Sequence, residues 1–316
     1  MAKRKSAKWA RLWQVAVVLL VVGLVVLFDI LQGQSVLPTW DELYDGAGLV
    51  KHEEALPQDT LLIEMMDVGN ADAILLKAGE HSMLIDAGER EDGETVLSRL
   101  QENGVKQLNY VIATHADSDH IGGMQTVLEG MAVKHYIMAF MPEGSTPTTK
   151  TYLHLLQTID TLDIPITEAE VGSRFSLGEG TVEILGPVTD FRENNNQSVI
   201  CRVQFGKRKF LFVGDAEEQA ERALLDSGAD LAADLLKVGH HGSSGSSSPA
   251  FLKAVNPTYA LISCGVGNSY GHPHKALLNR LKSQQVITYR TDLNGIVRVV
   301  CDGDAIQITS EKGAAT

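Results

Sequence analysis

The sequence predicts a mixed α/β fold. Short apolar runs with strand character alternate with segments in which apolar residues recur at helical spacing. Polar, chemically active groups repeatedly follow the strand-like runs, which is where such scaffolds carry functional loops. The chain has 316 residues and a hydrophobic content of 44%, enough for one large globular domain or two small ones.

The predicted elements follow in order from Thr60 onward. Strands are expected where aliphatic and β-branched runs are bounded by turn residues, and helices where apolar residues recur every three to four positions. The expected strands are 61–68, 72–78, 81–88, 108–114, 133–140, 181–187, a strand–turn–strand over 197–215, and 234–239, 258–265, 286–291, 295–302 and 305–310. The expected helices are 94–104, 120–130, 149–163, 216–228, one between the Gly/Ser loop and 258, and 274–283.

The N-terminal segment is expected to lie outside this fold. The uncharged run 12–28 has 17 residues, and a membrane-spanning helix needs about 17–25. The predicted division is a basic arm over 1–11, a transmembrane signal-anchor over 12–31, a linker over 32–58, the globular domain over 59–311 and a tail over 312–316.

Charge is distributed unevenly along the chain. Residues 1–31 carry five Lys or Arg side chains and one acidic residue, Asp29, which gives this segment a net charge of +4. Because the whole chain has a net charge of −13, residues 32–316 have a net charge of −17. By the positive-inside rule the arm is cytoplasmic and the domain extracytoplasmic, tethered to the cell membrane by a single span. A cleaved signal peptide is the alternative, although the run exceeds the usual signal core of about 7–15 residues.

The three cysteines, Cys201, Cys264 and Cys301, are odd in number and form no CxxC pair, so no disulfide framework is expected. Cys201 and Cys264 lie in apolar strand-like runs and are expected in the core.

Six of the ten histidines gather in three clusters at strand ends. The isolated ones, His52, His81, His135 and His154, are expected to be structural.

The stretch THADSDHIGG places His115, Asp117, Asp119 and His120 in one loop after a buried strand. Groups crowded in this way repel or desolvate each other unless a positive charge sits among them. A divalent cation is therefore expected. One ion could use three of the four groups, whereas two ions about 3.5–4 Å apart would use all four and need a bridging carboxylate.

Asp215, in FLFVGDAE, is the natural bridging carboxylate. It follows an apolar strand and stands beside a glycine that permits close approach. The alternative is that Asp215 caps the helix that follows, which is a common role for aspartate. Both roles can coexist.

Two further histidine pairs follow strands. In KVGHHGSSGSSS, one of His240 and His241 can complete a metal shell while the other donates a proton or contacts substrate, and the pattern leaves open which. In YGHPH, His272 and His274 either take part in the site or simply begin the next helix, with Pro273 in its first turn. The run ENNNQS, 193–198, is either part of the site or a polar approach to a hairpin.

These motifs, in this order, resemble the metallo-β-lactamase superfamily. They are most similar to the metallohydrolase domain of ComEC-type competence proteins, which take up DNA. Supporting motifs are DVGNADA (67–73), LIDAG (84–88), NNNQS (194–198), YGHPH (270–274) and YRTDLNG (289–295). The resemblance covers about residues 60–310 and implies a four-layer αββα sandwich with a dinuclear site at the edge of the two sheets.

The resemblance also implies a set of site residues and two divalent ions, Zn²⁺ or Mn²⁺. The first ion is expected on His115, Asp117 and Asp215, and the second on Asp119, His120, Asp215 and His240. Catalytic or substrate contacts are expected from Asp119, His241, Asn196, His272 and His274. Asp86 and Asp72 are expected to orient the ligands from behind.

The chain departs from the superfamily pattern at two positions. Asp117 replaces the second histidine of HxHxDH, and Asn196 stands near the position of the histidine that usually precedes the bridging aspartate. Both changes enrich the first metal's surroundings in hard oxygen, which favours Mn²⁺ or Mg²⁺ over softer metals.

The expected function is hydrolysis of a phosphodiester. DNA is one candidate substrate, but an exported domain at −17 lacks the basic residues that attract a polyanion. A small or cell-surface ester is an alternative substrate. A non-catalytic alternative is a metal-stabilised binding subunit of an uptake machine. The sequence does not identify protein partners.

Overall fold

Two mixed β-sheets pack face to face. The computed structural model describes residues 57, 59–142 and 144–315, which fall in one compact unit. The first sheet contains, in spatial order, β15 (Ile306–Ser310), β14 (Val297–Cys301), β1 (Leu61–Met65), β2 (Ala73–Ala78), β3 (His81–Ala87), β4 (Gln107–Ala113), β5 (Ala132–Met138) and β6 (Ile166–Glu168). The second contains β13 (Ile287–Arg290), β12 (Tyr259–Ile262), β11 (Leu235–Lys237), β10 (Arg208–Phe212), β9 (Ile200–Phe205), β8 (Gly180–Gly186) and β7 (Arg174–Leu177).

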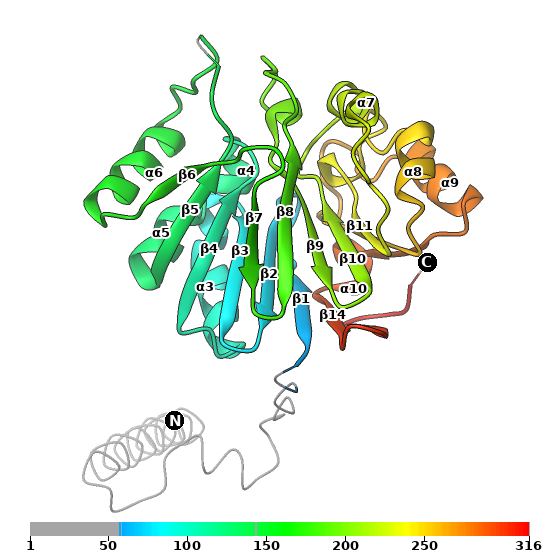
Figure 1. Ribbon diagram of the computed structural model, residues 1–316, viewed down its shortest axis with the longest axis horizontal. Helices are drawn as coiled ribbons and strands as arrows, with labels where there is room; N and C mark the ends of the chain where they lie inside the picture. The colour runs from blue at the N-terminus through cyan, green and yellow to red at the C-terminus, as the bar shows by residue number, and fades with distance from the viewer. Residues whose placement is uncertain (1–56, 58, 143, 316) are drawn as a thin grey trace, which may run out of the picture. The chain divides into compact units, whose positions relative to one another are not determined.

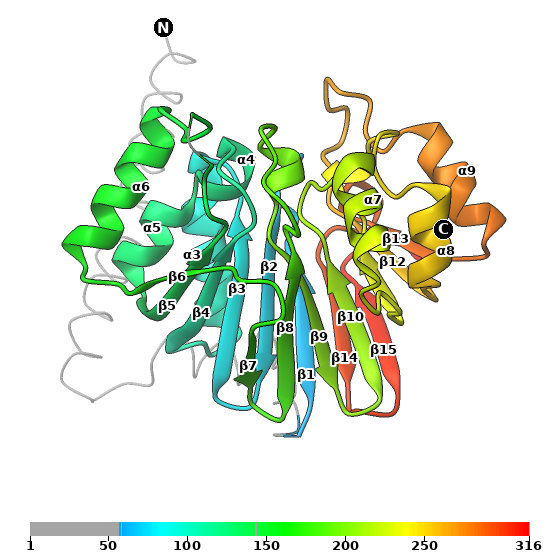
Figure 2. The ribbon, with the colours of Figure 1, turned by 45° about the horizontal axis from the view of Figure 1, so that its top comes forward.

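Helices cover the outer face of each sheet. On the first sheet lie α3 (Gly93–Glu102), α4 (Ser118–Ile121), α5 (Met124–Gly130) and α6 (Lys150–Thr161). On the second lie α7 (Glu218–Ser227), α8 (Pro249–Val255) and α9 (Lys275–Ser283). Figure 1 and Figure 2 show the two groups of helices on opposite sides of the paired sheets. The architecture is therefore the α/β sandwich that the sequence predicts.

Side chains that point alternately to the two faces of each strand form three hydrophobic cores, one between the sheets and one between each sheet and its helices. In β2, Ile74 and Leu76 face the other sheet, whereas Leu75 faces the helices. In β10, Phe210 and Phe212 enter the same central core, and Leu211 packs under α7 and α8. Successive side chains of a strand point to opposite faces, so strands buried on both faces are apolar at nearly every position. Cys201 and Cys264 are buried in these cores as expected, and all three cysteines are free.

Two details differ from the expected elements. The helix expected over 120–130 is broken into α4 and α5 at Gly122 and Gly123. A Cβ on Gly123 would lie 2.2 Å from the carbonyl oxygen of Ala87, so only glycine lets this turn cross the end of β3. Strands β6 and β7 carry no clear strand pattern because most of their side chains are exposed.

The predicted segments 1–11, 12–31 and nearly all of 32–58 lie outside the described residues. Among the residues that the structure describes, no helix has the length and apolar character needed to cross a membrane.

Candidate metal centre

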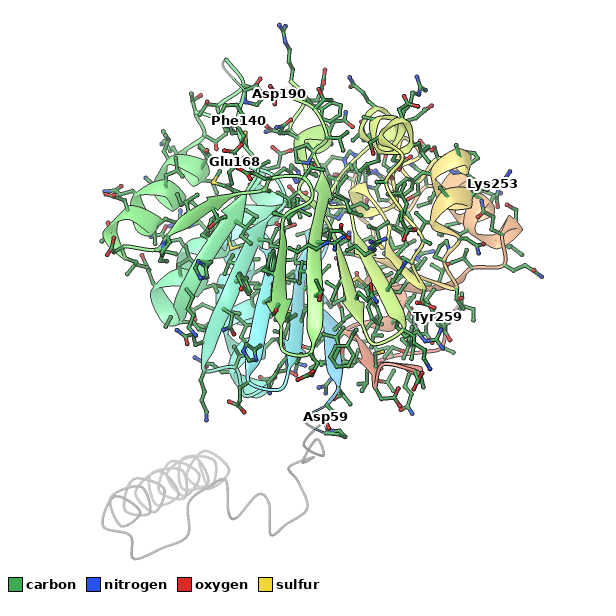
Figure 3. All side chains as sticks on the ribbon, in the orientation of Figure 1. Asp59, Phe140, Glu168, Asp190, Lys253 and Tyr259 are labelled. Atoms are coloured by element: carbon green, nitrogen blue, oxygen red, sulfur yellow. The ribbon has the colours of Figure 1, made fainter. Side chains whose placement is uncertain are left out.

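The polar motifs meet at one edge of the sandwich. Strands β3 and β4 are parallel in the first sheet, and β10, β11 and β12 are parallel in the second. Asp86, His115, Asp215 and His240 lie at or just beyond the carboxyl ends of β3, β4, β10 and β11, and His272 lies in the loop that follows β12. Ligand sites of α/β sheets typically form outside such strand ends. Figure 3 marks this edge with Phe140 and Asp190, and the opposite edge with Asp59.

Four side chains form the centre of the site. Ligand atoms of Asp119, His120, Asp215 and His241 all lie within 4.8 Å of one another. Asp215 Oδ1 lies 3.4 Å from His120 Nε2, and Asp215 Oδ2 lies 3.5 Å from His241 Nε2. Asp119 Oδ2 lies 3.2 Å from His241 Nε2. Asp215 therefore stands between two histidines that come from different sheets.

Asp86 holds the first of these histidines from behind. It accepts a hydrogen bond from the amide of Thr114 (2.8 Å) and another from the Thr114 hydroxyl (2.6 Å), and its Oδ2 lies 2.8 Å from His120 Nδ1. With Nδ1 on the carboxylate, Nε2 of His120 points into the cluster. A carboxylate in this position can orient a metal-binding imidazole.

The cluster contains polar atoms that the protein itself does not satisfy. Within the described part of the chain, the buried atoms His115 Nε2, His120 Nε2 and Asp215 Oδ1 have no hydrogen-bond partner. Buried polar atoms are costly without partners. Imidazole nitrogens and carboxylate oxygens are the usual ligands of Zn²⁺ and Mn²⁺. The residues present fit a candidate dinuclear centre.

Electrostatic coupling in the cluster is strong. Burial opposes a charge on His120, but the carboxylates of Asp215 and Asp86 outweigh it and raise the pKa of His120 well above its usual value. Burial likewise opposes the Asp215 carboxylate, yet His241 and His120 hold its pKa well below the usual range. The protein therefore keeps an anion at Asp215 although the side chain is buried.

The alternative role of Asp215 as a helix cap is not what the structure shows. Asn196 takes that role: its Oδ1 accepts hydrogen bonds from the amides of Glu217 (3.1 Å) and Ala220 (3.3 Å) at the start of α7. Gly214 beside Asp215 permits the predicted close approach, because its φ is +52° and a Cβ there would lie 2.8 Å from Thr114 Cβ.

The structure does not place Asn196, the predicted substrate contact, at the pocket. Its side chain is buried at the helix start and is not among the residues that line the pocket over the cluster. The two preceding asparagines, Asn194 and Asn195, are the ones that contact residues of the site. Asn194 Nδ2 donates to Asp117 Oδ1 (2.9 Å), and Asn195 Nδ2 lies 3.3 Å from His240 Nδ1.

His240 and His241 lie in the opposite arrangement to the one expected from the sequence. His241, expected to contact substrate, is the one buried in the central cluster. His240, expected as the ligand, has a partly exposed side chain, with Nδ1 at 2.8 Å from Glu217 Oε1 and Nε2 at 3.7 Å from Asp215 Oδ2. Both residues have positive φ, 47° and 49°, and this tight turn directs the second ring inward.

The expected first metal site is looser. The rings of His115 and His120 have centroids 4.1 Å apart and planes tilted by 54°, and Asp117 Oδ2 lies 3.5 Å from His115 Nε2. The neighbouring His115 ring is the main cause that lowers the pKa of Asp117, with further help from the Asn194 hydrogen bond. The structure brings His115 and Asp117 together at the edge of the central cluster.

His272 and His274 separate in the structure. His272 lines the pocket, and its ring lies 5.4 Å from that of His240. Burial and the neighbouring His240 and His241 lower the pKa of His272 to about 4. His274 Nδ1 accepts a hydrogen bond from the Ser244 amide (2.9 Å), so this ring supports the Gly/Ser loop instead.

Lys237 is a residue that sequence reasoning missed. It ends β11 and is almost fully buried, and its Nζ lies 2.7 Å from Asp72 Oδ2. Asp72 Oδ1 in turn lies 3.5 Å from His241 Nδ1, whose hydrogen-bond partner is the carbonyl oxygen of Ser263 at 3.1 Å. The sequence feature that could have indicated its role is a lysine in the otherwise apolar run LLKVG (235–239).

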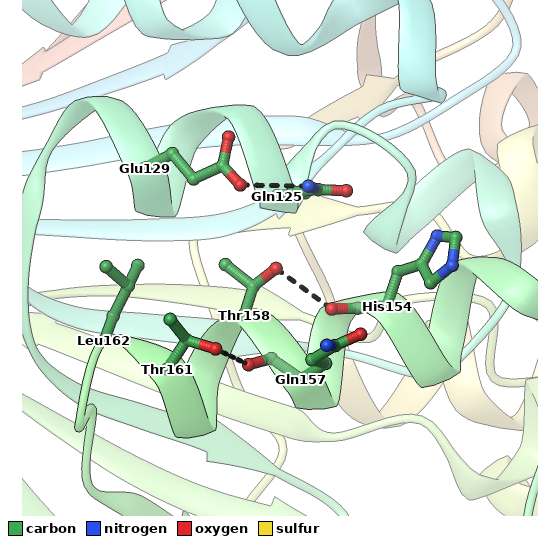
Figure 4. Close-up of a pocket in the computed structure, with 7 residues that line it drawn as sticks. All are labelled: Gln125, Glu129, His154, Gln157, Thr158, Thr161 and Leu162. Atoms are coloured by element: carbon green, nitrogen blue, oxygen red, sulfur yellow. Dashed lines mark hydrogen bonds between the residues drawn. The ribbon is translucent and has the colours of Figure 1, made fainter.

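The pocket over the cluster has a volume of about 430 Å³. Its walls come from the loops after β1, β4, β8, β10, β11 and β12, from α4 and from the start of α6. A separate depression between α5 and α6 (Figure 4) is lined by groups that satisfy one another, such as Gln125 with Glu129 at 2.9 Å and Thr158 with the His154 carbonyl at 2.9 Å. The candidate metal ligands therefore line the pocket over the cluster and not the depression between α5 and α6.

Comparison with known proteins agrees with this geometry. Residues 66–266 match the family model of the metallo-beta-lactamase superfamily. The chain is 31% identical over 255 residues to ComE operon protein 3 of Bacillus subtilis, covering 75% of this chain and 32% of that protein. It is 30% identical over 256 residues to competence protein ComA of Neisseria gonorrhoeae, covering 80% of this chain and 34% of that protein.

These curated relatives are ComEC-type competence proteins, and the chain spans about a third of their length. Among solved structures, CmlA, a diiron beta-hydroxylase from Streptomyces venezuelae, has a TM-score of 0.51 at 14% identity, covering 83% of this chain and 59% of that one. That likeness concerns the fold alone. The family model, the sheet arrangement and the cluster of histidines and carboxylates agree, and the chain belongs to the metallo-β-lactamase superfamily.

Proposed function

We propose that this protein is a membrane-anchored, metal-dependent phosphodiesterase that acts outside the cytoplasm. The observation that carries the proposal is the cluster of Asp119, His120, Asp215 and His241, together with buried nitrogen and oxygen atoms that the described part of the chain does not pair. Two divalent cations, when bound there, would supply Lewis-acid chemistry that lowers the pKa of water and neutralises charge on a phosphoryl oxygen.

The residues of the site divide into those that would bind the metal ions and those that would transfer protons. Asp119, His120, Asp215 and His241 would hold the second ion of the proposed pair, and His115, Asp117 and Asp215 would hold the first. Asp86 Oδ2, 2.8 Å from His120 Nδ1, and the carbonyl oxygen of Ser263, 3.1 Å from His241 Nδ1, fix the orientation of the two rings. Each ring then presents Nε2 to the site.

His240 is assigned to proton transfer. Glu217 lies 2.8 Å from its Nδ1, which leaves Nε2 directed toward the cluster. Such a carboxylate–imidazole pair fixes the tautomer and orientation of a proton donor. His240 Nε2 would deliver the proton to the departing alkoxide oxygen of the diester.

The substrate is proposed to be a phosphodiester because three carboxylates give the centre a hard oxygen character suited to Mn²⁺ as well as Zn²⁺. The similarity to competence proteins supports a link to DNA uptake. Long DNA is disfavoured, since none of the described residues that line the pocket is Lys or Arg. A short diester fits the site better.

The test is hydrolysis by the purified full chain, loaded separately with Mn²⁺ and Zn²⁺, of a model diester, DNA, a lactone and a β-lactam. We expect turnover of the diester and its loss with chelator. Turnover of the β-lactam with inert diesters would overturn the proposal. For location, protease added to intact cells should degrade the domain, and full protection would contradict the proposed orientation.

A further inference from the structure

A large aromatic side chain stands exposed at the rim of the metal pocket. Tyr270 lines the pocket together with Asp119, Asp215 and His241, yet it is 68% exposed. Tyrosine offers a broad apolar face, and leaving that face in water forfeits the free energy of its burial. An exposed ring beside a reactive centre is therefore suited to contact a ligand.

The loop that carries Tyr270 is held in one conformation. The side chain of Asn268 donates to the carbonyls of Gly265 (2.9 Å) and His272 (2.6 Å) and accepts from the His272 amide (3.0 Å). The Tyr270 ring lies nearly parallel to the His272 ring, with 20° between planes and 5.6 Å between centroids. The ring is thus positioned before any ligand arrives, so binding pays little ordering entropy.

The remaining walls of the pocket are uncharged away from the metal cluster. Asn70, Thr149, Thr151 and Asn195 supply amide and hydroxyl groups, and no lysine or arginine occurs among the described lining residues. The metal centre can hold the phosphoryl group, but the substituents of the diester must be held without ion pairs. Stacking of a flat ring on tyrosine is an attraction of this kind and tolerates any nucleobase.

We propose that Tyr270 is a stacking platform for a nucleobase next to the scissile phosphodiester, so that the site selects nucleotide-type diesters over aliphatic ones. This inference rests on the proposed phosphodiesterase function and adds a substrate class to it. The role of Tyr270 is binding and specificity, and the chemistry belongs to the metal cluster.

The test compares two substrates that differ only in their bases: the dithymidine phosphodiester and the same deoxyribose diester with both bases replaced by hydrogen. Hydrolysis by the full chain is followed by chromatography, and kcat/KM is measured for each. Tyr270→Ala should lower the preference for the base-bearing diester roughly 5- to 150-fold, the equivalent of about 1–3 kcal/mol per stacked base. Tyr270→Phe should keep the preference, because it keeps the ring.

Tyr270→Leu and Val266→Ala complete the comparison. The leucine keeps apolar bulk without a π face and should lose the preference. Val266 lies on the same loop, is 84% exposed and does not line the pocket, so its substitution should leave the preference unchanged. Metal content and melting temperature, measured on every variant, show whether the cluster is intact.

Each outcome bears on a different claim. If Tyr270→Ala leaves the preference unchanged, or lowers both substrates equally with metal content intact, the stacking role is wrong while the phosphodiesterase function stands. Those results would fit a ring that contacts a protein partner instead. If the unaltered chain hydrolyses neither diester with Mn²⁺ or Zn²⁺, the proposed function fails and the stacking role fails with it.

Discussion

Lys237 Nζ lies 2.7 Å from Asp72 Oδ2, and both side chains are almost completely buried directly behind His241. Lys237 also donates to the carbonyl of Val238 at 3.0 Å. The other oxygen of Asp72 faces His241 Nδ1 at 3.5 Å. The lysine therefore fixes the carboxylate that stands behind a cluster histidine, and it joins β11 to the loop after β1.

Replacing Lys237 with methionine should destabilise the protein strongly. The substitution leaves the Asp72 carboxylate buried without its cation, which costs about 3–5 kcal/mol when one partner of a buried pair is removed. Urea unfolding of the full chain measures the change. The double variant Lys237→Met/Asp72→Asn removes both charges and should recover most of the loss.

The matched control is Lys207→Met. Lys207 pairs with Asp304 at the same 2.7 Å, but its side chain is 82% exposed, so the free energy of unfolding should change very little. Equal losses for Lys207→Met and Lys237→Met would show that the buried pair has no special role.

Asp215→Asn should abolish metal retention at the cluster. The amide keeps the shape of the side chain but removes the anion between His120 and His241, whose Nε2 atoms lie 3.4 and 3.5 Å from its oxygens. Metal content by mass spectrometry and melting temperature are measured on the same sample. Retention of both ions with full activity would mean that Asp215 is not a ligand.

Asn196→Ala tests the corrected position of that residue. It removes the acceptor for the Glu217 and Ala220 amides at the start of α7, and loss of such a cap costs about 0.5–2 kcal/mol. Metal content and kcat should stay near those of the unaltered chain. A loss of activity without a loss of stability would restore the substrate role that the sequence predicts.

His241→Ala and His240→Ala should differ in their effects on metal affinity. His241 is buried among the carboxylates, so its removal should release metal, whereas His240 lies on the partly exposed side and should lose rate with metal retained. Metal titration by calorimetry and steady-state kinetics separate the two outcomes. Release of metal from His240→Ala alone would reverse the assignment.

Metal binding should release protons. In the metal-free protein, burial opposes protonation of His120, but Asp215 and Asp86 raise its pKa well above the usual value, so the ring keeps its proton to higher pH than a free histidine does. A metal needs the neutral ring, and affinity should therefore rise with pH until pH passes that raised pKa. Calorimetry in two buffers of different ionisation enthalpy measures the release, and buffer-independent heats would contradict it.

The sequence by itself determined the layers and the place of the site. A nearly continuous apolar run such as Leu61–Met65 predicts a strand buried on both faces, because successive side chains point to opposite sides. Polar motifs directly after such strands predict a site at the strand ends. Local spacing was also sufficient to single out His115, Asp117, Asp119 and His120 as one loop.

Only the tertiary structure decided which of several neighbouring residues faces the site. Asn195–Gln197 form a single 3-10 turn, in which successive side chains point roughly 120° apart, so one position along the chain separates a pocket wall from a helix cap. The choice between His240 and His241 depends on two consecutive residues with positive φ. Such a turn is fixed by packing against distant strands, and the buried partner of Lys237, Asp72, lies 165 residues away; neither relation leaves a local pattern in the sequence.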